Sequence, residues 1–145
     1  MRTTLLGLAV LATAVSANAQ MELTFGLRNH SGFTLRYVRQ QVDANRVSVL
    51  GPATAIAPNG VGILYSSCRG RNAGVLEYEG VYRDAKSDRT YKRTYELHFR
   101  VGPDGNEASC ESPGDSSPHC TAGVNPKSCN GKPGACSVVI DYTFK

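Results

Sequence analysis

The sequence predicts an all-β protein, an antiparallel β-sandwich or a small barrel, formed by a single domain of residues 20–145. Apolar and polar residues alternate with a period of two through most of the chain. Turn signals rich in Gly, Pro and Asn separate these runs, and we find no convincing helical pattern of ten or more residues after residue 19. Short strands with turns between them are typical of sandwiches and small barrels.

The N-terminal half of this domain is expected to supply four strands. In the first, Met21, Leu23, Phe25 and Leu27 alternate with smaller or polar residues, and Asn29–Gly32 then predicts a hairpin turn, since Asn and Gly accept positive φ. The next strands are predicted over 33–37, 47–50 and 61–67. A turn over 56–60, ending in Pro-Asn-Gly, precedes the last of these.

The C-terminal half is expected to contain a strand over 75–83, a longer one over 91–101 and a final one over 136–144. In the long strand the apolar residues share one face, and the other face carries Lys92, Thr94, Glu96, His98 and Arg100. In the last strand the side chains predicted to point inward are Val138, Ile140, Tyr142 and Phe144. Both halves therefore predict sheets with one apolar and one polar face.

The first nineteen residues have the pattern of a secretory signal peptide. Arg2 precedes a short apolar stretch, and Ala17-Asn18-Ala19 is a small-x-small cleavage site. The apolar stretch is shorter than the ~20 residues that span a bilayer. We expect cleavage after Ala19 and a protein that is secreted or periplasmic, whose mature chain carries only a mild positive charge.

The five cysteines indicate an oxidising compartment. Four of them are expected to form disulfides that pin a long, turn-rich loop over 102–135, before the last strand: Cys110, Cys120, Cys129 and Cys136. Their spacing differs from the short Cys pairs of zinc sites, so we expect neither a metal nor another cofactor. The pairing stays open. The remaining Cys68 is predicted to be a buried thiol or to link two chains in a disulfide-bonded dimer.

Charge is distributed unevenly along the chain. Six arginines but a single acid, Asp43, occur between residues 28 and 71, whereas 102–120 carries four acids and no Lys or Arg. A basic face of this kind suits an anionic partner, although the mild net charge indicates no nucleic acid. The candidate binding residues are Arg28, Arg36, Arg39, Arg69, Arg71, His119, Lys127 and Lys132. Asn29-His30-Ser31 also matches the acceptor sequence for N-glycosylation, and its use is left open.

A set of short motifs carries a family resemblance. They are Asn29-x-Ser-Gly-Phe-Thr-Leu35, Ile56-Ala-Pro58, Gly74-Val75 with Tyr78, Leu97-x-Phe99 and Pro103-x-Gly-Asn106. Their order is similar to that in aegerolysins and, more distantly, actinoporins, which are small β-sandwich proteins that bind membrane lipids and can build pores. The resemblance implies a sandwich and a lipid partner, and it assigns no functional residue.

Three functions are therefore compared. The favoured hypothesis is a secreted, non-catalytic protein that binds lipids or membranes, as an effector or a toxin component. The second is an extracytoplasmic inhibitor or immunity protein whose loop 102–135 inserts into a target protein. The third is a secreted ribonuclease in which Glu96 takes the 2′-hydroxyl proton, His98 protonates the leaving oxygen and Arg100 stabilises the phosphoryl charge.

Overall fold

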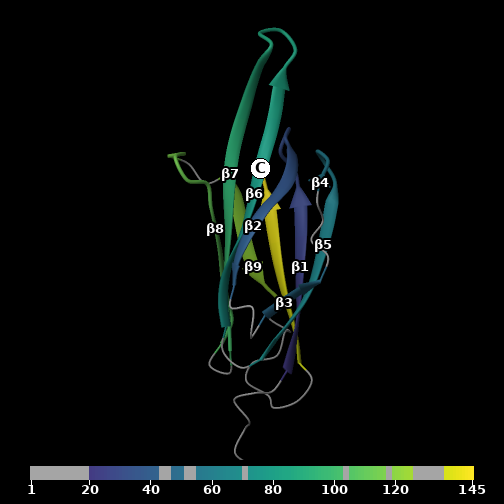
Figure 1. Ribbon diagram of the computed structural model, residues 1–145, viewed down its shortest axis with the longest axis vertical. Coiled ribbons are helices and arrows are strands. Elements are labelled where there is room, and N and C mark those ends of the chain that lie inside the picture. Colours follow the sequence, from purple (N-terminus) through teal and green to yellow (C-terminus); the bar gives the residue numbers. More distant parts are fainter. Residues whose placement is uncertain are drawn as a thin grey trace, which may run out of the picture.

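The computed structural model describes residues 20–42, 47–50, 55–69, 72–102, 105–116, 119–125 and 136–145. The predicted signal peptide, residues 1–19, lies outside this part of the chain. The described residues form ten strands (Figure 1): β1 Gln20–Asn29, β2 Thr34–Val42, β3 Val47–Leu50, β4 Ala55–Ile56, β5 Val61–Arg69, β6 Asn72–Asp84, β7 Arg89–Val101, β8 Glu107–Glu111, β9 Cys120–Val124 and β10 Cys136–Phe144. The described residues include no helix long and apolar enough to cross a membrane.

The strands form two five-stranded sheets that pack as a sandwich, which confirms the predicted fold class. The first sheet has the order β3-β5-β1-β10-β9, and the second has the order β4-β2-β6-β7-β8. Nearly all neighbours are antiparallel, but β1 and β10 pair in parallel, with Phe25 opposite Ile140. This parallel pair places the first and last strands of the chain side by side in the first sheet.

The core lies between the two sheets and is built from the predicted inward faces. Leu23, Phe25 and Leu27 of β1 are buried, as are the alternate residues 138 to 144 of β10. Aromatic rings join the layers: Phe25 lies edge-on to Phe99 at 5.1 Å, and Phe144 meets Tyr95 at 4.9 Å between ring centroids. Burial of these apolar faces is the main driving force for folding.

The predicted hairpin over Asn29–Gly32 is wrong, because this turn connects the two sheets. β1 belongs to the first sheet and β2 to the second, so the strands on either side of the turn do not pair. The Asn29 side chain is fully buried, and its amide nitrogen points to the carbonyl oxygens of Phe33 at 2.7 Å and of Ile56 and Ala57 at 3.1 Å each. Its Oδ1 accepts hydrogen bonds from the Ser31 backbone nitrogen and hydroxyl.

These contacts also bear on the acceptor sequence at Asn29. Glycosylation needs the amide nitrogen to be accessible at the surface, but in the folded protein this atom is buried and bonded to the backbone. The folded structure therefore leaves no room for a sugar at Asn29, and the residue serves as a tie between the two sheets.

The predicted loop over 102–135 is partly wrong, because it contains two strands. β8 pairs with β7 at the edge of the second sheet, and β9 pairs with β10 at the edge of the first. The disulfide Cys110–Cys120, with its Cα atoms 5.8 Å apart, joins β8 to β9 and so connects the two sheets covalently. These short strands carry small residues in place of large apolar ones, which removed the alternating signal from the sequence.

The other cysteines are constrained through the backbone. Cys68 on β5 and Cys136 on β10 both lie opposite Met21, on either side of β1. Two strand spacings separate them by about 9.5 Å, more than the ~7 Å that a disulfide spans between Cα atoms. They therefore do not pair with each other. Cys129 lies outside the described residues, and the dimer linked through Cys68 stays a prediction.

Removal of the Asn29 amide should destabilise the whole fold. In Asn29→Ala, several buried backbone groups lose their partners, and each such group costs about 1–3 kcal/mol. We expect the free energy of unfolding, measured by urea denaturation, to fall by at least about 2 kcal/mol. A change below about 0.5 kcal/mol, typical of a neutral surface site, would contradict this role.

Two buried tyrosines should respond differently to loss of the hydroxyl. Tyr142 donates a hydrogen bond of 2.6 Å to the carbonyl oxygen of His98, whereas the buried Tyr78 hydroxyl has no partner among the described residues. Burial raises the pKa of both phenols. Thermal unfolding should show that Tyr142→Phe loses about 1 kcal/mol and that Tyr78→Phe loses none. Equal losses in both variants would be inconsistent with this assignment.

Candidate functional site

The β6–β7 hairpin projects beyond the rest of the sandwich. Its strands pair over their full length, from Asn72 opposite Val101 to Asp84 opposite Arg89. The neighbouring strand β2 pairs with β6 only as far as Val81. Residues 82–91 therefore extend past both neighbouring strands, β2 and β8, and Figure 1 shows this tip well beyond the ends of all the other labelled strands.

Two tyrosines are exposed on this projection. Tyr82 and Tyr91 lie opposite each other in the ladder, with ring centroids 6.3 Å apart, and Phe33 meets the Tyr82 ring edge-on at 5.8 Å. They lie on the side of the hairpin that is buried farther down at Tyr78 and Tyr95. Because the opposite sheet does not reach this far, Tyr82 is 44% exposed and Tyr91 is 47% exposed.

Basic residues surround these tyrosines. Lys92 pairs with Glu79 at 2.9 Å. Arg83 pairs with Asp88, and the Arg93 guanidinium lies 5.0 Å from the centre of the Phe33 ring, where it also bonds to Asp115.

Two further cations, Lys86 and Arg89, lie at the tip. Both are exposed and form no ion pair within the described part of the chain. The tip therefore offers two free cations beside two exposed aromatic rings.

Asp84 holds the turn at the tip. Its carboxylate accepts hydrogen bonds from the Lys86 backbone nitrogen at 3.0 Å and from the Ser87 hydroxyl at 2.6 Å. These two bonds, the one from the Ser87 side chain most of all, lower the pKa of Asp84. The next turn residue, Asp88, has a positive φ of 53°. The tip is thus an ordered turn, tied by its own side chains.

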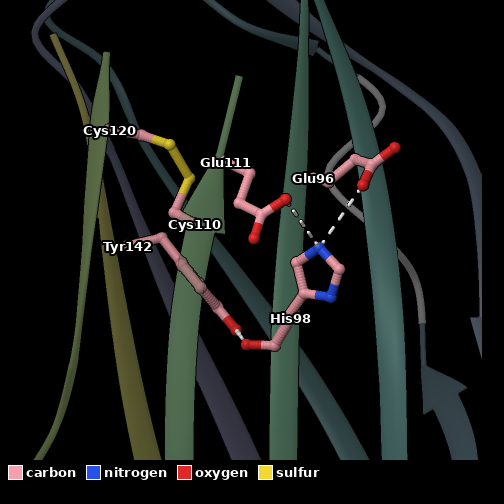
Figure 2. The surroundings of a disulfide bond; sticks show 6 residues. All are labelled: Glu96, His98, Cys110, Glu111, Cys120 and Tyr142. Atoms are coloured by element: carbon pink, nitrogen blue, oxygen red, sulfur yellow. Dashed lines mark hydrogen bonds and ion pairs between the residues drawn. A yellow bond between two sulfur atoms is a disulfide. The ribbon is translucent and has the colours of Figure 1, made fainter. Parts of the chain in front are cut away.

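A second cluster lies on the outer face of the second sheet, near the disulfide. Three glutamates occupy one row across this face, because Glu77 lies opposite Glu96 and Glu96 lies opposite Glu111. Arg39 of β2 ends the row and bonds to Glu77 at 2.7 Å. The other two carboxylates converge on His98, whose Nε2 lies 3.3 Å from Glu96 Oε2 and 4.0 Å from Glu111 Oε2 (Figure 2).

The ribonuclease hypothesis can be compared with this geometry. Glu96, His98 and Arg100 share one face of β7, as the alternation predicts, and Glu96 is adjacent to His98. Arg100, however, forms an ion pair of 2.6 Å with Glu107 on β8. Sequence reasoning missed Glu111, because its strand was not predicted and only the strand register brings it to His98.

The structure places the predicted basic residues on different surfaces. Arg28 lies on the outer face of the first sheet, Arg36 and Arg39 lie on that of the second, and His119 is half-buried 3.7 Å from Asp115. Arg69 is described only through its backbone in β5. Outside the described residues are Arg71, Lys127 and Lys132. The described members of the set therefore do not share one face.

The first sheet also carries exposed apolar side chains. Val61, Ile63 and Tyr65 alternate along the outer face of β5 and are between 49% and 68% exposed. This stripe lies on the opposite layer from the β6–β7 hairpin. It provides an aromatic and aliphatic surface against which the properties of the hairpin tip can be compared.

Comparison with known proteins supports the architecture. No protein-family model and no curated protein matches the chain significantly. Solved structures do match its fold. The fold is similar to that of Nakanori, a lipid-binding protein. The alignment with Nakanori has a TM-score of 0.52, covers 88% of this chain and 71% of the other, and has 7% sequence identity, so that the likeness concerns the fold.

The hydrogen bonds at the hairpin tip predict a low titration midpoint for Asp84. The amide proton of Lys86, followed by NMR, should shift with a midpoint below pH 3.8, the ordinary value. Since the folded pKa is depressed, the tip turn is stabilised above that pH and loses this stabilisation as the pH falls through the lower, folded value. A midpoint at or above 3.8 would show that the carboxylate does not hold the turn.

Proposed function

We propose that this chain is an exported, non-catalytic protein that binds membrane lipids through the tip of the β6–β7 hairpin. The observation that carries the proposal is the exposed pair Tyr82 and Tyr91 on a projecting hairpin, beside Lys86 and Arg89, which form no ion pair with the described residues. Tyrosine is enriched where a protein meets the membrane interface, because its ring is apolar and its hydroxyl is polar. Both rings are already exposed at the tip, so the sandwich does not have to rearrange to present them.

The charges fit a membrane with anionic headgroups. Each Lys or Arg close to such a surface contributes about 1 kcal/mol of attraction. Lys86 and Arg89 are free to make this contribution, whereas Arg83 and Lys92 already pair with acids of the hairpin. Binding should therefore combine shallow insertion of two aromatic rings with a modest, salt-sensitive attraction.

Two further observations support the proposal. The lipid-binding protein Nakanori has a similar fold, which makes a lipid ligand a reasonable expectation for this architecture. The Cys110–Cys120 disulfide indicates an oxidising compartment outside the cytosol, where the outer surface of a membrane is accessible. Effector or toxin activity would be a consequence of such binding.

A vesicle co-sedimentation experiment tests the role of the tyrosines. The full chain should sediment with phosphatidylcholine vesicles that contain phosphatidylserine, and the double variant Tyr82→Ser/Tyr91→Ser should bind about tenfold more weakly, since about 1.4 kcal/mol corresponds to this factor. The matched control is Tyr65→Ser, which removes a tyrosine that is 56% exposed on the other layer. This control should bind like the original chain.

The outcomes separate the hypotheses. Retained binding in the double variant, or no binding to any vesicle, would contradict the proposal. The β5 stripe favours a different function, an inhibitor that docks on a target protein through Val61, Ile63 and Tyr65. Loss of vesicle binding in Tyr65→Ser with retention in the hairpin variant would transfer the binding role to that stripe and reject the hairpin.

A further inference from the structure

We propose that Glu96, His98 and Glu111 form a binding site for a divalent transition-metal cation of the zinc class. The three residues come from adjacent strands, Glu96 and His98 from β7 and Glu111 from β8. Their ligand atoms all lie within 4.8 Å of one another. One imidazole nitrogen with two carboxylate oxygens is a donor set that suits zinc and its neighbours rather than calcium or magnesium.

The distances fit one ion bound between the three groups. Bonds from zinc to nitrogen or carboxylate oxygen are about 2.1 Å long, so tetrahedral ligands lie about 3.4 Å apart and opposed ligands about 4.2 Å apart. The separations of 3.3 Å and 4.0 Å from His98 Nε2 to the two carboxylates fall close to this range. The Glu111 side chain is 65% exposed, so it is free to move toward the other two ligands and complete the coordination.

The negative charges of the glutamate row, Glu77, Glu96 and Glu111, favour a bound cation between Glu96 and Glu111. Glu96 and Glu111 lie directly opposite each other on neighbouring strands, an arrangement that is unfavourable for like charges. Arg39 compensates Glu77 at the other end of the row. In the described part of the chain, His98 is the only group that pairs with either of the two remaining carboxylates.

His98 itself is oriented as a ligand. Its Nε2 atom is covered from solvent and has no hydrogen-bond partner of proper geometry among the described residues, although both carboxylates face it (Figure 2). Such an orphaned nitrogen is uncommon in folded proteins and calls for an explanation, and a bound ion is one such explanation. A bound metal would satisfy this nitrogen and neutralise both carboxylates together.

The surroundings hold the three ligands in place. The backbone at His98 is fixed by the hydrogen bond from the buried Tyr142 hydroxyl to its carbonyl oxygen. Next to Glu111, Cys110 is bonded to Cys120, which anchors the edge strand β8 to the other sheet. Three protein ligands leave a coordination position for water or a ligand from a partner, and a hollow lined by Gln41, Val75 and Glu77 adjoins the site.

The site is tested by isothermal titration of the chelator-treated, disulfide-intact chain with Zn²⁺, after alkylation of free thiols. We expect one ion per chain with a micromolar dissociation constant. His98→Ala and Glu111→Gln should each raise this constant tenfold or more. The matched control is Glu107→Gln, which removes a carboxylate from the same face of β8 that pairs with Arg100. It should bind Zn²⁺ as the original chain does.

Further readouts keep the result interpretable. Each variant should retain the circular dichroism spectrum of the original chain, since all three substituted side chains are partly or largely exposed. Vesicle binding through the hairpin should be unchanged. Co²⁺ should give a visible absorption spectrum that disappears in His98→Ala. Absence of Zn²⁺ binding, binding that survives both substitutions, or a preference for Ca²⁺ over Zn²⁺ would overturn the proposal.

Discussion

The buried amide of Asn29 is the interaction on which the arrangement of the two sheets depends. A sandwich needs a place where the chain leaves one layer and enters the other, and the backbone groups at that crossing must still find partners. Asn29 supplies them, since its side chain reaches the carbonyl oxygens of Phe33, Ile56 and Ala57 while its own backbone nitrogen bonds to Gly60. One side chain thereby ties the end of β1, the start of β2 and the β4–β5 turn. The aromatic core then packs between two sheets whose relative position is held at this crossing.

A covalent bond joins the two sheets at one edge of the sandwich. Cys110 and Cys120 join the edge strands β8 and β9, which belong to different sheets. The β6–β7 hairpin extends from the second sheet. Its tip is supported because the same two strands carry the core residues Tyr78 and Tyr95 farther down. The two sheets are thus tied at the Asn29 crossing and at the β8–β9 edge, and the proposed lipid-binding tip and metal site lie on different parts of one sheet.

Much of the fold could be predicted from alternation alone. The strands over 47–50 and 136–144 and the inward faces around Phe25 and Tyr142 agree with the structure. β8 and β9 were missed because Ala108, Cys110 and Ala122 are too small to give an apolar pattern. The turn at Asn29 was misassigned because local turn chemistry does not say which sheet the next strand joins. The exposure of Tyr82 and Tyr91 depends on where the other layer ends, and the approach of Glu111 to His98 depends on strand register, so neither was visible in the sequence.

The most direct test of lipid binding through the hairpin is hydrogen exchange measured by mass spectrometry, with and without vesicles containing phosphatidylserine. Membrane contact slows exchange where backbone amides are shielded or their opening is suppressed. The account predicts that protection on binding is concentrated in residues 82–91, with no change over 61–65. Protection centred on 61–65, or spread evenly over both sheets with none at the tip, would contradict it.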